Sequence, residues 1–376
     1  LQKYKLLVLQ TRYNCTNPKL RAEEKEVLSS AQFINGPAVR NFQADLEAYL
    51  GVKHVIPCAN GTDALQVAMM GLGLKPGDEV ITADFTFAAT VEVIALLGLT
   101  PVLVDVLPDT FNIDPDAIEK VITPNTKAIV PVHLFGQVAD MDRIMDIAQK
   151  HNLFVIEDNA QGIGATHTDA AGTKVKTGGI GHVGSTSFFP SKNLGCYGDG
   201  GAILTNDDDL AHTIRGVVNH GMYKRYHHDV VGVNSRLDSL QAVVLNEKLK
   251  LLDFYNERRK WAAIRYSQLL QDHPKIETPV TSGDCDSHVY HQYTLKIVGA
   301  DRDALVQHLQ QNDIPCGVYY PIPLHLQKAY VDTRYKEADF TVTNQLIDEV
   351  VSLPMHSELD EDQIQFICKT ILAFLD

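Results

Sequence analysis

The chain of 376 residues is longer than one hydrophobic core usually organises, and this length predicts a large domain with a smaller companion. Its composition, 45% hydrophobic and 21% charged, is that of a folded globular protein and argues against disorder. The formal charge of -14, from 33 Lys+Arg against 47 Asp+Glu, and the lack of a long basic run argue against a nucleic-acid-binding protein.

Cysteine usage and apolar runs indicate the compartment. The six cysteines form no C-x-x-C pair and no zinc spacing, which fits a reducing environment better than a disulfide framework. The first residues, LQKYKLLVLQTRYN, contain too short an apolar core for a signal peptide, and no apolar run is long enough to cross a bilayer. We therefore expect a soluble, cytoplasmic protein that does not associate with membranes.

Short β-branched runs alternate with helical patterns along the first two thirds of the chain, which is typical of parallel strands joined by helical crossovers. Strands are expected at 53–60, 78–84, 100–107, 127–134, 153–160, 185–191 and 201–206. Helices are expected directly after the first two strands, at 61–73 and 86–98. Several strands are apolar on both faces, so the sequence predicts a mostly parallel sheet of seven strands covered by helices on each side.

The pattern changes near Leu237, where helical spacing of apolar residues continues to Leu270 and predicts one long interdomain helix. Beyond it, strands are expected at 288–298 and 317–323, and helices at 300–312, 339–353 and 360–375. We therefore expect a large α/β domain with an amino-terminal arm (1–245) and a smaller α+β domain (246–376), joined by the helix around 237–270.

Ligands of an open parallel sheet bind beyond the carboxyl ends of the strands, so the residues after each strand deserve most weight. Asn60, Gly61 and Thr62 follow the first strand and open a helix, an arrangement that suits a phosphate but is also an ordinary helix cap. Phe85 and Phe87 follow the second strand, where an aromatic ring could stack on a flat cofactor or belong to the core.

A carboxylate pair, Glu157 and Asp158, ends the fifth strand, and Gln161 follows one turn later. Such a carboxylate can cap a helix, bind a metal, or keep a heteroaromatic nitrogen protonated and so make the ring a better electron sink. His288 and His291 lack the surroundings of a zinc site, and we expect no metal.

Lys192 stands in the stretch SFFPSKNLGCYGDGG, between an apolar run and a glycine-rich tail. A lysine among Phe188, Phe189 and Pro190 should have a lowered pKa and more free amine, which can form a Schiff base. The alternative is a surface lysine, but the flanking sequence argues against it.

A phosphate cradle, an aromatic ring, a carboxylate and a lysine in this chain order resemble the fold-type I pyridoxal phosphate enzymes. CANGTDAL, GDEVITADFTFAAT, PVHLFGQVADM, VIEDNAQGIGA, TSFFPSKNLGCYGDGGAI, the G-x-N-S-R segment at 232–236 and YYPIPLHLQ together resemble the DegT/StrS group of sugar-nucleotide aminotransferases. The resemblance extends from about Phe33 to the carboxyl end, and it implies an α/β fold-type I aminotransferase with a smaller carboxyl-terminal domain.

The resemblance also implies roles for individual residues. Lys192 would form the internal aldimine and carry the proton, and Asp158 would pair with the pyridinium nitrogen. The remaining cofactor contacts would be Gly61, Thr62 and Ser187 to the phosphate, Phe87 on the ring face, Gln161 to the ring hydroxyl, and Asn234 to the phosphate of a neighbouring subunit. The last contact implies a homodimer with shared active sites.

The activity implied is transfer of the amino group of L-glutamate to a nucleotide-linked ketosugar, with pyridoxamine phosphate as the intermediate cofactor form. Some relatives that are dehydratases have histidine at the lysine position, so Lys192 favours transamination. The motifs are most similar to enzymes that aminate C3 of UDP-linked N-acetyl keto-uronic acids for bacterial surface polysaccharide such as the lipopolysaccharide O-antigen. Substrate contacts would be Arg236, Tyr319, Tyr320 and His325.

Alternatives for the substrate stay open. Arg236 could pair with the uronate carboxylate or make a more general contact. Tyr319 stands where that subgroup is expected to have histidine, and the loop at 166–182 is longer than in many relatives. Other candidates are a 3- or 4-aminotransferase acting on a dTDP-, GDP- or UDP-linked keto-deoxysugar and, more remotely, a non-catalytic regulatory protein with this fold.

Overall fold

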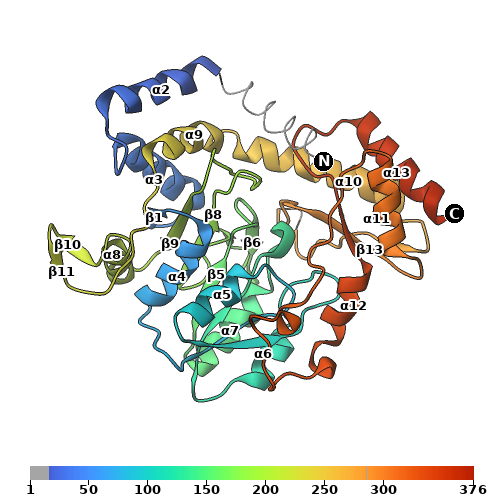
Figure 1. Cartoon of the computed structure of the whole chain (residues 1–376), viewed down its shortest axis with the longest axis horizontal. Helices are drawn as coiled ribbons and strands as arrows, with labels where there is room; N and C mark the ends of the chain where they lie inside the picture. The colour runs from blue at the N-terminus through green and yellow to red at the C-terminus, as the bar shows by residue number, and fades with distance from the viewer. Residues whose placement is uncertain (1–16, 285) are drawn as a thin grey trace.

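A central sheet of seven strands organises the protein in the computed structural model, which describes residues 17–284 and 286–376 (Figure 1). The strands are β1 (His54–Cys58), β2 (Glu79–Ala83), β3 (Thr100–Val104), β4 (Thr126–Val130), β5 (Phe154–Asp158), β8 (Val183–Ser187) and β9 (Gly201–Thr205). They lie in the order β1-β9-β8-β5-β4-β2-β3, and only β9 runs antiparallel to its neighbours. The predicted mostly parallel sheet of seven strands is therefore confirmed.

Helices cover both faces of this sheet. On one face lie α4 (Gly61–Gly71), α5 (Ala89–Leu96) and α8 (Asp208–Val217), and on the other lie α3 (Pro37–Leu50), α6 (Pro115–Val121), α7 (Met141–His151) and α9 (Ser239–Leu249). Successive residues of a strand point to opposite faces, so Ala128 and Val130 of β4 pack with α4 whereas Ile129 packs with α7. This double burial explains why the strands read as continuous apolar runs.

A second, antiparallel sheet forms the core of the C-terminal lobe, the name used here for residues 252–376. Its strands are β12 (Ile276–Glu277), β13 (Tyr293–Ile297) and β14 (Val350–Leu353). The helices α10 (Leu252–Leu270), α11 (Arg302–Gln311) and α13 (Glu361–Leu375) share one hydrophobic cluster with these strands, and α12 (Thr341–Glu349) leads into β14. Figure 1 shows this lobe at the right, in orange and red, beside the central sheet.

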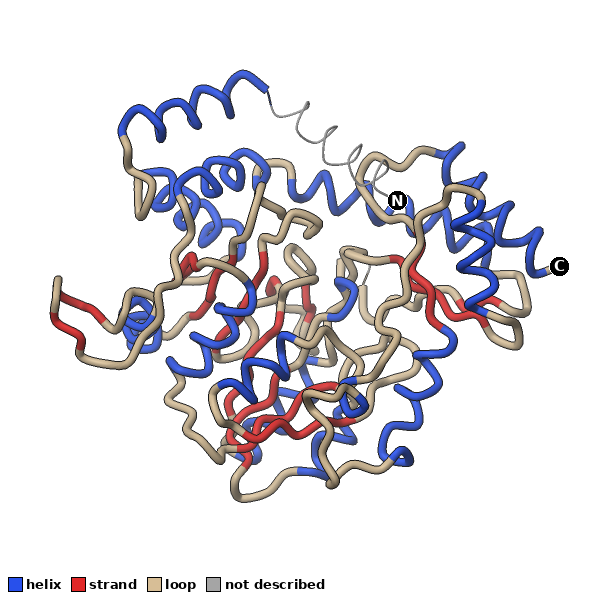
Figure 2. Tube along the Cα trace, viewed as in Figure 1, coloured by secondary structure: helices blue, strands red, loops and turns tan. Residues whose placement is uncertain are grey.

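Smaller elements lie around these two sheets. They are α2 (Asn17–Ser30), the hairpin of β6 (Thr166–Thr168) and β7 (Lys174–Lys176), the hairpin of β10 (Met222–Lys224) and β11 (His227–His228), and the short helices η1 (Leu134–Gly136), η2 (Leu324–Leu326) and η3 (Glu337–Phe340). The β10-β11 hairpin projects from the body at the left of Figure 2. Within the described residues no helix is both long and apolar enough to cross a membrane. The amino-terminal stretch interpreted above lies outside the described residues.

The single long helix predicted for 237–270 is wrong. The helix is interrupted between α9 and α10 at Leu251, whose φ and ψ are -111° and 1°. Neither proline nor glycine stands at the break, but Leu249 and Leu252 are both buried on the large-domain side. The bend lets α9 pack against α3 while α10 packs against α13. The predicted domain boundary at 245 and 246 falls inside α9 and stays a prediction.

Two predictions in the C-terminal lobe are also corrected. The helix expected over 339–353 ends at Glu349, and its last four residues form β14, which pairs with β13; a short apolar run cannot distinguish the two states by periodicity. The strand expected over 317–323 is only a bridge from Gly317 to Ser352, because two prolines remove amide donors from its second half.

Candidate active site

The start of α4 forms a cradle at the carboxyl end of β1. The Asn60 side chain caps the helix by accepting a hydrogen bond from the Asp63 amide at 2.8 Å. A Cβ on Gly61 would lie 2.6 Å from the Ser187 Cβ, so only glycine lets the helix start approach the end of β8 this closely. Gly61, Thr62 and Ser187 are therefore brought together beside free helix amides, which favour an anion.

The glycine-rich stretch after Lys192 also allows two segments of backbone to approach closely. A Cβ on Gly201, the first residue of β9, would lie 2.4 Å from the Asn60 carbonyl oxygen. The turn that carries the cradle is thus packed directly on the end of the lysine loop. Two sequence features that looked separate, the N-G-T turn and the glycine tail, form one contact.

Asp158, the last residue of β5, is buried at the same edge. Its Oδ2 accepts a hydrogen bond from the Thr90 hydroxyl at 2.8 Å, and its Oδ1 accepts one from the Ala160 amide at 3.1 Å. These two donors fix the orientation of the carboxylate and leave acceptor capacity for a further donor. Thr90 was missed in the sequence because a threonine in the first turn of a helix gives no signal of its own.

The neighbouring Glu157 has a different task. It is fully buried and accepts hydrogen bonds from His133 Nε2 at 2.9 Å and from the amides of Gly178 and Gly181. Burial alone would raise the pKa of Glu157, but these hydrogen bonds lower it below the usual range. Glu157 holds the segment after β7 against the sheet, which leaves Asp158 as the carboxylate of the site.

Lys192 lies on the loop between β8 and β9, where its amide donates to the Phe189 carbonyl at 2.8 Å. Burial, opposed by the negative charge of Asp158, lowers the pKa of Lys192 to about 8. No hydrogen bond or ion pair of its ammonium is found with the residues that the structure describes. The structure thus places a readily deprotonated amine near the Asp158 carboxylate.

Buried polar residues fasten the lysine loop from outside. Asn193 donates to Asn256 of α10 at 2.8 Å and to the Val289 carbonyl at 3.1 Å. Lys248 of α9, only 2% exposed, donates to the Gly195 carbonyl at 2.6 Å. The long helical pattern gave no hint of these contacts, since they depend on how α9 and α10 dock.

An aromatic and amide cluster completes the site. Gln161 accepts a hydrogen bond from the Phe135 amide at 2.7 Å and donates to the Tyr320 hydroxyl at 3.2 Å. The Tyr320 ring lies 6.3 Å from that of Phe87 and 6.0 Å from that of Phe85. Phe85 is buried in the core, whereas Phe87 is 58% exposed and free to stack on a ligand.

The other predicted residues lie at the margin of this site. Asn234 and Arg236 flank Ser235, whose hydroxyl accepts from the Ala59 amide at 3.1 Å and donates to Asp63 at 2.6 Å. Asn234 is exposed, and its contact with a neighbouring subunit stays a prediction. Tyr319 is 37% exposed, whereas His325 is only 5% exposed and pairs with Asp84, a residue that the sequence did not indicate.

These residues fit pyridoxal phosphate. The helix start accepts a phosphate, Asp158 can pair with a ring nitrogen, Phe87 offers a face for stacking, and Lys192 offers an amine. Within the described residues, no group of three or more His, Cys, Asp or Glu side chains is arranged so that it could hold a metal ion.

A family model described as DegT/DnrJ/EryC1/StrS aminotransferase family matches residues 14–372. The chain belongs to this family. It is 46% identical, over 94% of its length and 95% of the relative, to a UDP-2-acetamido-2-deoxy-3-oxo-D-glucuronate aminotransferase from Pseudomonas aeruginosa. It is 44% identical, over 98% of both chains, to a pleiotropic regulatory protein from Geobacillus stearothermophilus.

Solved structures agree with this placement. S. venezuelae DesV in complex with a ketimine intermediate superposes with a TM-score of 0.92 at 37% identity, covering 98% of this chain and 97% of that one. NtdA from Bacillus subtilis with bound cofactor PMP superposes with a TM-score of 0.87 at 34% identity, covering 94% and 81%. The protein is thus a PLP-dependent sugar-nucleotide aminotransferase with the fold-type I architecture, and its cofactor alternates between pyridoxal and pyridoxamine phosphate.

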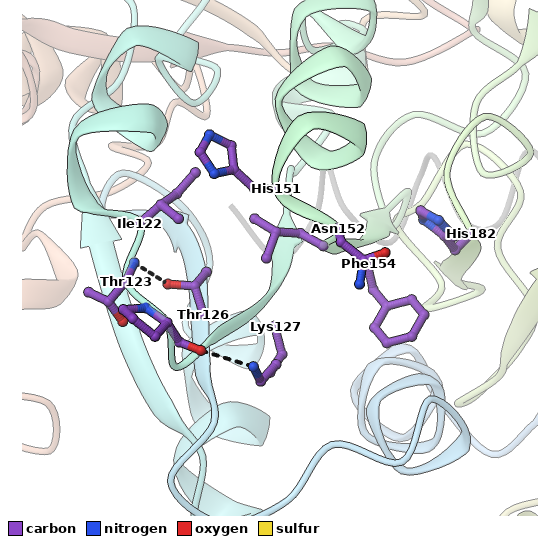
Figure 3. Close-up of a pocket in the computed structure, with 10 residues that line it drawn as sticks. Ile122, Thr123, Thr126, Lys127, His151, Asn152, Phe154 and His182 are labelled. Atoms are coloured by element: carbon purple, nitrogen blue, oxygen red, sulfur yellow. Dashed lines mark hydrogen bonds between the residues drawn. The ribbon is translucent and has the colours of Figure 1, made fainter.

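A hollow lies at the opposite side of the sheet, called here the amino edge, where the parallel strands begin (Figure 3). It has a volume of about 500 Å³ and lies between the turn before β4, the end of α7 and the start of β5. Its basic side chains are Lys127, His151 and His182. Lys127 donates to the Pro124 carbonyl at 3.0 Å, and His182 Nδ1 accepts from the Val155 amide at 3.0 Å, so both serve the protein itself.

Proposed function

We propose that the protein transfers the amino group of L-glutamate to C3 of a UDP-linked N-acetyl-3-keto-uronic acid, for the synthesis of a bacterial surface polysaccharide. The observation that carries the catalytic part is the buried Lys192 amine, whose pKa is lowered to about 8 by burial and whose charge interacts with that of Asp158. The Pseudomonas aeruginosa relative supports the choice of sugar. A 3- or 4-aminotransferase acting on another nucleotide-linked ketosugar is the alternative.

The residues of the site would either bind the cofactor or move a proton. The cofactor, when bound, supplies a carbonyl carbon for imine chemistry and a ring that accepts electrons. Lys192 Nζ would hold the cofactor through its carbonyl carbon and, once free, would serve as the base that moves a proton. Asp158, held by Thr90 and Ala160, would keep the ring nitrogen protonated. The α4 amides, Thr62 and Ser187 would hold the phosphate, and Phe87 would offer a face for stacking on the ring.

Arg236 supports a carboxylated substrate. It lies between the cradle-bound Ser235 and the start of α9, is partly buried, and makes no hydrogen bond or ion pair within the described residues. Its planar fork of N–H donors matches a carboxylate such as that of a uronic acid. One relative, 44% identical, is named for UDP-N-acetyl-3-dehydro-α-D-glucosamine, a sugar without that carboxylate, and this sugar provides the comparison for a test.

A homodimer with shared active sites is part of the proposal. Asn234 is exposed beside its own cradle, and Val231 on the same stretch is 86% exposed. Phe87 and Phe189, at the mouth of the site, are likewise more than half exposed. A second copy would cover these apolar side chains. The test is a mixed dimer of Lys192→Ala and Asn234→Ala subunits, which restores one complete site if the two residues come from different chains.

The first experiment records the visible absorbance of the purified protein with pyridoxal phosphate, before and after excess L-glutamate. Conversion of the lysine-bound cofactor band to the pyridoxamine band is expected, because it reports the glutamate half-reaction. A cofactor band that does not respond to glutamate would point to another donor or to a non-catalytic protein. No band at all would contradict the role of Lys192.

The second experiment compares UDP-N-acetyl-3-keto-glucuronate with the corresponding 3-keto-glucosamine sugar, which has a hydroxymethyl group in place of the carboxylate. Arg236→Ala should lower kcat/KM for the uronate by about 10- to 100-fold, since a charge-assisted pair is lost, and hardly affect the neutral sugar. Arg236→Lys serves as the matched control that keeps the charge but not the fork. Equal losses on both sugars would contradict the carboxylate contact.

A further inference from the structure

A segment of the C-terminal lobe reaches over to the candidate active site, where Gln161 holds Tyr320. It is tied to the end of β2, where the Leu324 amide donates to the Asp84 carbonyl at 3.3 Å and the Asp84 side chain binds His325. The segment runs from Gly317 to Leu326 and carries Tyr319 and Tyr320. Its tie is Asp84, the residue directly after β2. Asp84 Oδ1 accepts a hydrogen bond from the His325 amide at 2.7 Å, and its Oδ2 lies 2.6 Å from His325 Nδ1.

This tie is closed off from solvent. Asp84 is fully buried and His325 is 5% exposed, and the ring of His325 stacks on Phe340 at 4.3 Å between centroids and 13° between planes. His325 Nε2 makes no hydrogen bond with the described residues, whereas Nδ1 faces a carboxylate oxygen, which can only accept, so Nδ1 donates to Asp84. Phe340 covers one face of the His325 ring, and Asp84 occupies its Nδ1 edge. These contacts leave His325 well placed to act through its neighbours.

The ionisation of Asp84 fits this arrangement. Burial raises the pKa of Asp84 to about 6, and the hydrogen bonds from His325 oppose that shift. The other titratable groups close enough to interact with Asp84 are Asp105 and Tyr335. At pH 8 the carboxylate is ionised, and each of its oxygens can accept one of the two hydrogen bonds.

The stretch of chain between His325 and the two tyrosines is short and conformationally restricted. Pro321 and Pro323 stand between Tyr320 and His325, and each fixes its own φ and restricts the residue before it. Tyr320 accepts a hydrogen bond from Gln161 and packs between Phe85 and Phe87. The position of His325 therefore sets the position of both tyrosines.

The outer face of the segment is built for a substrate larger than glutamate. Tyr319 is 37% exposed, Ile322 is 47% exposed and Leu326 is 55% exposed, so this segment presents side chains to solvent on both sides of the Tyr320 contact with Gln161. Glutamate reacts at the cofactor itself, where Lys192 and Asp158 lie. A nucleotide-linked sugar is long enough to reach the outer wall.

We propose that Asp84 and His325 are a positioning pair that fixes Tyr319 and Tyr320 as a wall of the acceptor site, so that the pair governs binding of the nucleotide-linked ketosugar and not the reaction with glutamate. The proposal rests on the proposed function for the identity of the acceptor. It assigns His325 a supporting place behind the wall, with Asp84 as its anchor.

The test uses Asp84→Asn in the full-length enzyme, because the amide keeps the shape of the side chain but can accept only one of the two hydrogen bonds. We expect KM for the accepted UDP-ketosugar to rise by about 10-fold or more, and the rate of the glutamate half-reaction to change less than about 3-fold. Amide hydrogen exchange in 317–326 at pH 8 should become faster in the cofactor-loaded enzyme.

Asp105→Asn is the matched control. Asp105 directly follows β3 and accepts hydrogen bonds from the amides of Val342 and Thr343, so it ties the next strand end to the same lobe through α12 and not through the tyrosine segment. The Asp105→Asn variant should change thermal stability without changing the KM for the sugar or the amide hydrogen exchange of residues 317–326. Equal effects of Asp84→Asn and Asp105→Asn on the sugar KM would overturn the proposal, because the pair would then only support the fold.

His325→Asn and His325→Leu separate hydrogen bonding from packing. Asparagine keeps an N–H donor near the position of Nδ1, so it should retain most of the wild-type KM, whereas leucine should behave as Asp84→Asn does. Equal defects in both variants would overturn the pair as a hydrogen-bonded tie. If the wild-type enzyme accepts no sugar, the proposed function fails. The amide hydrogen exchange of residues 317–326 then still tests the positioning pair, because unchanged exchange in both Asp84→Asn and His325→Leu would reject it.

Discussion

Basic side chains lie at both the amino and the carboxyl ends of the central strands, but only the carboxyl ends carry one that is arranged for chemistry. At the amino edge, Lys127 and His182 are hydrogen-bonded to backbone groups of the protein. At the carboxyl edge, Lys192 stands near Asp158 with a lowered pKa. A cavity of about 500 Å³ is therefore a poorer guide to function than the pairing state of the groups around it.

The direction of the helices explains this difference. In a parallel sheet the crossover helices begin at the carboxyl edge, where their free amides favour anions, and end at the amino edge, where carbonyls face outward. α4 begins at the cradle, whereas α7 ends at the hollow and is closed there by Asn152 at φ 52°. A phosphate-bearing cofactor is thus favoured at one edge and disfavoured at the other.

The largest expected effect is that of Lys192→Ala, which removes the amine from the carboxyl edge. Turnover should fall by at least about 10³-fold, since both the imine-forming group and the proton carrier are lost. The variant should still fold and bind cofactor through the cradle, as measured by thermal unfolding and equilibrium dialysis. Normal transamination by Lys192→Ala would show that the wrong residue has been assigned.

Removal of the buried carboxylate should have the next largest effect. Asp158→Asn should reduce turnover by roughly 10²-fold, because a preorganised charge is lost from the site. Thr90→Val, which removes only one hydrogen bond to Asp158, should cost about 10-fold. Steady-state rates with saturating glutamate measure both, and a larger loss for Thr90→Val than for Asp158→Asn would contradict the assigned order of roles.

A pH effect should follow from the lowered pKa of Lys192. Only the neutral amine attacks pyridoxal phosphate, so addition of the cofactor to the cofactor-free protein should speed up about tenfold per pH unit up to about pH 8 and then level off. Stopped-flow absorbance measures this rate. A rate that keeps rising to pH 10 would mean that burial does not depress the pKa of this lysine.

The smallest effect is expected at the amino edge. Lys127→Ala and His182→Ala should change turnover and cofactor affinity less than about 2-fold, because surface substitutions away from a site have small effects. Parallel assays beside the Lys192→Ala variant test this directly. A loss of more than tenfold in either variant would break the distinction between the two edges.

Local patterns in the amino-acid sequence were enough to predict the strands of the large domain and the chemistry at their ends. Each strand is a short apolar run closed by polar or glycine residues, and parallel strands necessarily bring those ends to one edge. This is why Gly61, Asp158 and Lys192 could be placed together from their order along the chain. The family resemblance then supplied the cofactor and the reaction.

Only the tertiary structure decided how the second half of the chain is divided and how the site is supported. The break at Leu251, the strand β14 and the tie between Asp84 and His325 have no local signal, since each depends on packing between segments far apart in sequence. Thr90 and Lys248 likewise acquire their roles from partners 68 and 53 residues away. Local periodicity reports which face of an element is buried, but the partner buried against it is set by the long-range contacts of the folded chain.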